Sequence, residues 1–213
     1  AVDYVEGGNF TINKPEQYDF WKNYVPSFSD YPLLSWHAVN SADTASFKEF
    51  TLFPNEKGIP SLFTYRRILD VSILKETLYK GDISLVNWPQ NDYFLGPIID
   101  VPEEERRKHL DNAKQLSLSL LYWLQTEAPR LEDDGKGYPG LRLRKDVLGT
   151  DDGFAKYPYI RESRRIKAIK TIKETDVSKE SRGNQGIRKY HDSVGVGSYH
   201  LDLHHTTNTN RTF

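Results

Sequence analysis

Residues 100–129, DVPEEERRKHLDNAKQLSLSLLYWLQTEAP, carry the clearest structural pattern in the sequence. Asp100 is a candidate N-cap, Pro102 falls in the first turn, and three consecutive glutamates lie where the helix dipole is positive. Pro129 ends the pattern, because proline disfavours helix in the residue before it. The apolar residues between these ends recur at helical spacing: Leu110, Ala113, Leu116, Leu120, Trp123 and Leu124. The stretch predicts one helix over about residues 101–127, roughly 37 Å long.

Strand-like runs flank this helix on both sides. The order of expected elements, which is strands, then one long helix, then more strands, indicates an α+β fold with an antiparallel or mixed sheet. Weaker patterns predict a hairpin over 1–12, a helix over 15–24, a short amphipathic piece at 71–79 and a loop from Glu132 to Gly153. The runs that favour strands are residues 33–39, 47–53, 61–69, 82–88, 157–173 and 190–203.

Composition excludes several classes of site. The chain has 213 residues, no Cys and no Met, with a formal charge of -1. Without Cys there is no disulfide, no thiolate nucleophile and no Cys-based metal site. The near-neutral charge argues against nucleic acid as a partner, and no apolar run approaches the roughly 18 residues of a membrane span. Since the initiator Met is missing, we expect a piece of a longer protein, and both a cytoplasmic and an exported location stay open.

A basic segment follows the predicted loop. On a strand over 157–173, Glu162 and Arg164 share the face of the apolar isoleucines, while Arg161 and Arg165 point the other way. The Glu and Arg could form a buried pair or line a cavity for an anion. Alternatively, residues 160–164 precede the strand and are solvated.

A glycine-rich segment near the end has two interpretations as well. Gly195 and Gly197 point the same way as Tyr199 on a strand, which favours close approach of a ligand or backbone, or else a bulge. His200, Asp202 and His204 follow at a period of two, a spacing that can hold zinc. The spacing is common by chance, so a hydrogen-bonded or exposed cluster is the favoured explanation, and we predict no metal site.

The segment NWPQNDYFLGP, residues 87–97, clusters aromatic and amide side chains between Pro and Gly. Asn87, Asp92 and Tyr93 are its candidate binding residues, since such loops bind sugars or planar ligands. The same composition is an ordinary way to end a strand. Elsewhere there is no GxGxxG, Walker A or GxSxG motif, and GVGS at 195–198 carries only two glycines.

Several motifs, taken in order, resemble one family. They are YRRI at 65–68, LVNWPQNDY at 85–93, SLLYWLQTEAP at 119–129, GYPGLRLRKDVLGTDDGFAKYPYIRESRRI at 137–166 and DSVGVGSYHLDLH at 192–204. This combination resembles the bacterial FAD-dependent oxidoreductases, some of which are labelled putative xanthan lyases. The resemblance covers most of the chain from about residue 60.

The resemblance implies a two-domain flavoprotein in which a Rossmann half with GxGxxG holds FAD. This sequence lacks that fingerprint and the final flavin-contacting segment. We therefore expect residues 1–190 to be a partial substrate (cap) domain, and 191–213 to be a strand returning towards the missing FAD-binding domain of the same parent chain. FAD is expected in the parent and not on this chain alone, which we do not expect to be active by itself.

The resemblance also implies roles for the candidate residues. The bare Gly195 and Gly197 face would approach cofactor or the missing domain, with Tyr199 and Asp202 in the same segment. His200 and His204 titrate in the right range for a base, but neither is assigned that role. The arginines and Glu162 at 161–165 would orient substrate or pair with the flavin domain, and residues 87–93 would form the pocket rim.

The substrate is open, with carbohydrate-derived molecules among the candidates. The runner-up interpretation is a carbohydrate-binding or polysaccharide-processing, lyase-like module without redox activity. A third is a structural domain whose exposed apolar surface is a cut interface.

Overall fold

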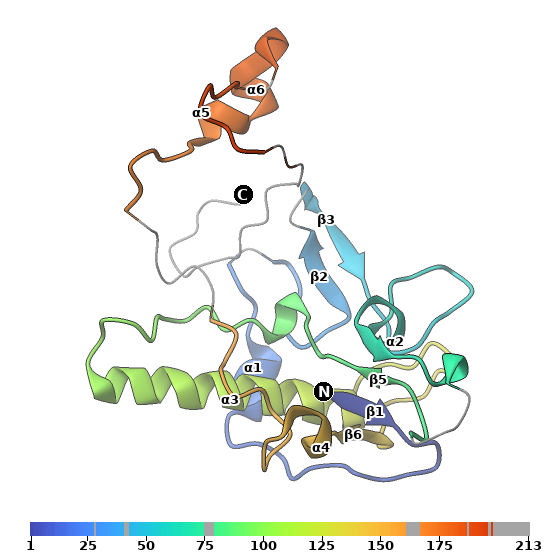
Figure 1. Ribbon diagram of the computed structural model, residues 1–213. Coiled ribbons are helices and arrows are strands. Elements are labelled where there is room, and N and C mark those ends of the chain that lie inside the picture. Colours follow the sequence, from blue (N-terminus) through green and yellow to red (C-terminus); the bar gives the residue numbers. More distant parts are fainter. Residues whose placement is uncertain are drawn as a thin grey trace.

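The computed structural model describes residues 1–27, 29–40, 43–74, 79–160, 167–186, 188–195 and 197. For residues 38–40 and 43–48 it describes the backbone alone. Within these ranges the fold is α+β: an antiparallel sheet packs with one long helix, and a separate hairpin stands beside them (Figure 1).

The main sheet has four strands in the order β4-β5-β1-β6, all antiparallel to their neighbours. Its central strand β1 pairs Val2 with Ser84 on one side and with Leu143 on the other. A second sheet is the β2-β3 hairpin. The strands are β1 (Val2–Tyr4), β2 (His37–Asn40), β3 (Asp43–Glu49), β4 (Arg67–Leu69), β5 (Ile83–Ser84) and β6 (Leu141–Leu143).

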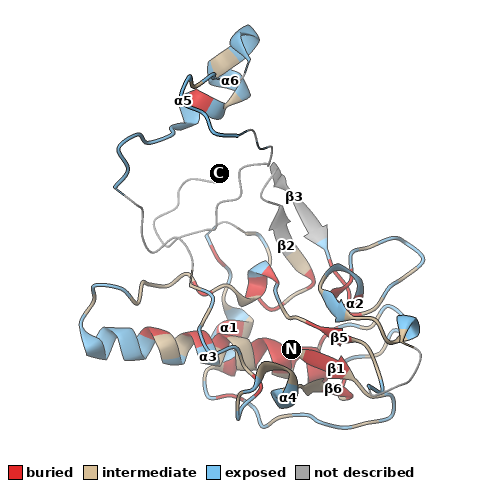
Figure 2. Ribbon diagram, viewed as in Figure 1, coloured by how far each residue is buried: buried red, intermediate tan, exposed pale blue. Residues whose placement is uncertain are grey.

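The long helix α3 (Glu103–Thr126) supplies most of the helical core. Its first turns are exposed and its second half is buried, as Figure 2 shows by the change from blue to red along the helix. Trp123 lies in an edge-to-face cluster with two other indoles, 5.1 Å from Trp36, which in turn lies 5.6 Å from Trp88. These large aromatic groups bury the most apolar area per side chain, so they anchor the core.

Gln125 of α3 is a buried side chain that bridges segments distant in sequence. Its Nε2 donates to the carbonyls of Phe10 and Leu141, both at 2.8 Å, and its Oε1 accepts from the Ile12 amide at 3.0 Å. Three backbone groups are thereby satisfied by one buried amide. The N-terminal segment is thus fixed against both the helix and β6.

The remaining helices are short, and none of those described is long and apolar enough to cross a membrane. Figure 1 shows α5 and α6 standing away from the body of the fold. The α-helices are α1 (Tyr18–Asn23), α2 (Leu62–Tyr65), α4 (Lys145–Leu148), α5 (Glu174–Val177) and α6 (Lys179–Arg182), and the 3₁₀ turns are Val71–Ile73, Pro89–Asn91 and Gly183–Gln185.

The predicted α+β class and the long helix are confirmed, but several local predictions are wrong. Residues 1–12 are not a hairpin, because β1 pairs with β5 and β6 and the Phe10 amide bonds to Pro139. The run 61–69 begins as helix α2, which buries Leu62 and Phe63 on the core before β4 starts. The predicted loop from Glu132 to Gly153 contains β6 and α4.

Helix and strand limits also differ from expectation. Pro102, not Asp100, is the N-cap of α3, and Asp100 instead takes a positive φ of 56°. The predicted strand 157–173 is absent from its described residues, 157–160 and 167–173, and residues 190–195 likewise form no strand. Ile169 and Ile172 are exposed there, so no apolar face holds the segment against a sheet.

Candidate functional site

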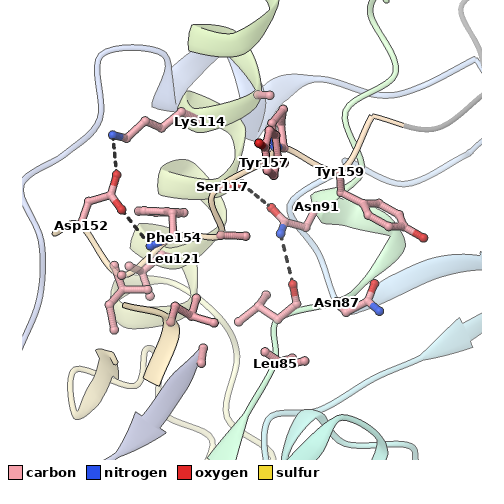
Figure 3. Close-up of a pocket in the computed structure, with 18 of the residues that line it drawn as sticks. Leu85, Asn87, Asn91, Lys114, Ser117, Leu121, Asp152, Phe154, Tyr157 and Tyr159 are labelled. Atoms are coloured by element: carbon pink, nitrogen blue, oxygen red, sulfur yellow. Dashed lines mark hydrogen bonds and ion pairs between the residues drawn. The ribbon is translucent and has the colours of Figure 1, made fainter. Parts of the chain in front are cut away.

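A pocket of about 540 Å³ lies beside α3 (Figure 3). One wall comes from the loop around the 3₁₀ turn Pro89–Asn91, a second from α3, and a third from residues 152–159. Its floor is apolar, since it is lined by Val2, Leu85, Leu110, Ala113, Leu121, Leu124, Leu143 and Leu148. An apolar floor with a few polar groups at its walls is typical of a ligand site.

The first polar wall joins the loop to the helix. Ser117 Oγ donates to Asn91 Oδ1 at 2.7 Å, and Asn91 Nδ2 donates to the Val86 carbonyl at 3.2 Å. Asn91 is therefore held in place by the protein. Asn87 lies at the same wall and is exposed, and within the described part of the chain its amide makes no hydrogen bond to the protein.

The second polar group is an ion pair at the opposite wall. Lys114 Nζ of α3 lies 2.8 Å from Asp152 Oδ2, and Asp152 Oδ1 accepts from the Phe154 amide at 3.0 Å (Figure 3). The Lys114 ammonium and the Phe154 amide hold the pKa of Asp152 below its usual range. Asp152 is therefore ionised at neutral pH, and its contacts connect residues 152–154 to the helix.

The third wall is aromatic. Phe154, Tyr157 and Tyr159 all come from the segment that follows Asp152, and the Tyr157 side chain is 84% exposed. The Tyr93 amide donates to the Tyr159 carbonyl at 3.3 Å, so this segment is attached to the polar loop. The aromatic wall thus adjoins the amide wall (Figure 3).

Behind the loop, Tyr93 is 2% exposed and its hydroxyl shares a 2.7 Å hydrogen bond with Nδ1 of His109. Burial raises the pKa of Tyr93, and a hydrogen bond from Asn112 opposes that rise. Nε2 of His109 lies 3.6 Å from Glu105, and the backbone of Gly96 passes directly against the imidazole. This buried cluster fixes the loop that carries Asn87 and Asn91.

Of the site residues predicted from the sequence, some line the pocket, some are exposed, and the rest lie outside the described residues. Asn87, Asp92 and Tyr93 come together in the lining of the pocket. Gly195 and Gly197 are exposed, and a Cβ built on either would meet nothing within 4 Å. The other candidates lie outside the described residues: Arg161, Glu162, Arg164, Arg165, Tyr199, His200, Asp202 and His204.

Sequence reasoning missed Lys114, Ser117, Asp152 and His109. A signal existed for His109 alone, because it occupies the apolar stripe of the helix, four residues before Ala113. In the described ranges, no group of three or more His, Asp or Glu residues is placed to hold a metal ion.

Comparison with known proteins bears on this pocket. A sequence model of the family described as FAD dependent oxidoreductase matches residues 6–213. The chain belongs to the FAD dependent oxidoreductase family. No curated protein and no solved structure matched it. The match confirms the resemblance to FAD-dependent oxidoreductases that the motifs predicted.

The described residues of this FAD dependent oxidoreductase family member do not fit the pyrophosphate of FAD. Proteins hold that group at a helix N-terminus that follows a glycine-rich turn. The N-terminus of α3 follows Pro102 and carries Glu103, Glu104 and Glu105 in its first turn, whose carboxylates would repel phosphate. The sequence has no GxGxxG motif either.

Proposed function

We propose that this chain is the substrate-side part of an FAD-dependent oxidoreductase and that the pocket beside α3 receives the substrate. The pocket is the observation that carries the proposal, because it combines an apolar floor with polar and aromatic walls in a chain of this family. Residues 1–190 would form the partial cap domain and 191–213 would return to the FAD-binding part of the parent chain.

In this proposal the chain's own residues bind and orient. Asn87 and Ser117 offer hydrogen bonds, Asp92 lies in the lining with Tyr93 buried behind it, and the aromatic segment excludes water. FAD, when bound by the parent, supplies the redox chemistry. The basic residues at 161–165 and the segment from Gly195 to His204 remain candidates for substrate or flavin-domain contacts.

A flavin titration tests the proposal. Absorbance and fluorescence of FAD are followed as this chain, and in parallel the longest parent protein, is added. Binding by the parent together with none by this chain supports the proposal, because the pyrophosphate site would then lie outside the described residues. Binding by neither protein overturns the oxidoreductase assignment for this chain.

The second candidate function is a carbohydrate-binding or lyase-like module without redox activity. The aromatic wall next to an amide wall favours it, since sugars stack on rings and hydrogen-bond to amides. Sugar binding by a parent that fails to bind flavin would select this candidate. Sugar binding beside flavin binding would make the sugar a substrate candidate of the oxidoreductase.

A further inference from the structure

The aromatic wall of the pocket suits a ligand with an apolar face. Tyr157 is highly exposed and Tyr159 is partly exposed, although both line the pocket. An aromatic side chain left in water is stabilised when the flat, C–H-rich face of a ring covers it. The ligand face towards residues 154–159 is therefore apolar.

The amide wall suits ligand edges that both donate and accept hydrogen bonds. Asn91 already uses its carbonyl oxygen with Ser117 and one amide hydrogen with Val86. Asn87 keeps both its donor and its acceptor for a ligand. A hydroxyl uses both kinds of group, whereas a carboxylate can only accept. The wall therefore favours hydroxyls.

The charges of the pocket argue against an anionic ligand. Its charged side chains are two of each sign: Lys114, Lys156, Asp92 and Asp152. Asp152 at 2.8 Å already neutralises Lys114, and both side chains are exposed, so a ligand carboxylate would gain little from this ammonium. Lys156 is exposed, where an ion pair contributes little.

We propose that the pocket takes a neutral pyranoside, with its C–H face against Tyr157 and its hydroxyls at Asn87 and Ser117, and that the Lys114–Asp152 pair disfavours the corresponding uronic acid. The proposal rests on the assignment of this pocket as the substrate site. It names the substrate class as an uncharged sugar ring.

Two probes that differ only at C6, methyl glucopyranoside and methyl glucuronopyranoside, test the proposal on this chain. Saturation-transfer NMR and titration of Trp fluorescence measure binding. We expect the neutral sugar to bind about tenfold more tightly, and Tyr157→Ala and Asn87→Ala each to weaken it severalfold. Tyr65→Ala is the matched control, because Tyr65 is also exposed and does not line the pocket. Circular dichroism verifies that each variant is folded.

Asp152→Asn separates the charge argument from the shape argument. Loss of that carboxylate frees Lys114, so the uronate should gain affinity while the neutral sugar changes little. Equal or tighter binding of the uronate to the unmodified chain overturns the proposal, as does the absence of binding by both sugars. The flavin titration is independent of these results. If the sugar-binding experiment fails, the oxidoreductase assignment is still decided by the flavin titration.

Discussion

The Tyr93 hydroxyl and Nδ1 of His109 lie 2.7 Å apart, and both side chains are buried where α3 meets the loop of the pocket. The other imidazole nitrogen lies 3.6 Å from Glu105 at the surface of the helix. Substitution of either partner of such a buried hydrogen bond lowers the free energy of unfolding, because the remaining group stays desolvated and unpaired. The pair therefore stabilises the fold and also holds the pocket loop against α3.

Tyr93→Phe should lower the free energy of unfolding by about 1–3 kcal/mol, since Nδ1 of His109 loses its partner in a buried site. Urea denaturation followed by Trp fluorescence measures the change. Tyr157→Phe is the control, because its ring is exposed and should change stability by less than about 0.5 kcal/mol. Equal effects of the two substitutions would contradict a structural role for the Tyr93 hydroxyl.

Gly96→Ala should destabilise the fold through a steric clash, because a Cβ at this position overlaps the His109 imidazole. The ring must move, and its bond to Tyr93 is then lost, so we expect about 1–3 kcal/mol. Gly195→Ala is the matched control, since open space surrounds that position. Thermal unfolding of both variants measures the difference, and an unchanged melting temperature for Gly96→Ala would reject the close approach.

Asp3→Asn should be strongly destabilising. The Asp3 side chain is 4% exposed and pairs with Arg142 at 2.6 Å and with Arg144 at 3.1 Å. Loss of its charge removes the buried partner that Arg142 and Arg144 share, although Arg144 keeps Asp146 at 2.6 Å, and we expect a loss of about 2–4 kcal/mol. Asp133→Asn removes the exposed pair with Arg130 and should change stability by less than about 1 kcal/mol. Denaturant titration compares the two, and similar losses would show that burial of Asp3 is unimportant.

Stability should fall in acid through Asp146. The Arg144 guanidinium, hydrogen-bonded to this carboxylate, holds the pKa of Asp146 at about 2 in the folded chain. Because that pKa is depressed, its stabilising effect is present above about pH 4 and is lost as the pH falls towards 2. Melting temperatures measured from pH 5 to 2 should drop less steeply for Asp146→Asn. Parallel curves for the two proteins would exclude the contribution.

Local pattern predicted the parts of the fold that local interactions determine. The helix α3 follows from apolar spacing within 24 residues, so the sequence alone sufficed. Strand β1 was paired wrongly because its partners, Ser84 and Leu143, lie far along the chain. Three-residue strands carry too little alternation to identify such partners. Strand β6 was missed for the same reason.

The candidate site likewise contains residues that the local sequence indicated and residues that it did not. Asn87 and Tyr93 belong to one aromatic and amide cluster, so composition pointed to them. Lys114 and Asp152 are ordinary surface residue types in their own segments and form a pair only when the chain brings them together, 38 residues apart. A side chain whose role depends on tertiary contacts leaves no local signal.

The amide of Gln125 has a consequence for the kinetics of folding. It bonds to Phe10 and Ile12, which lie 115 and 113 residues earlier, as well as to Leu141, 16 residues later. Closing the longer loop loses more chain entropy, so the contact with Leu141 should form first and the N-terminal contacts late. Substitution of Gln125 should therefore accelerate unfolding more than it slows the formation of the helix and β6.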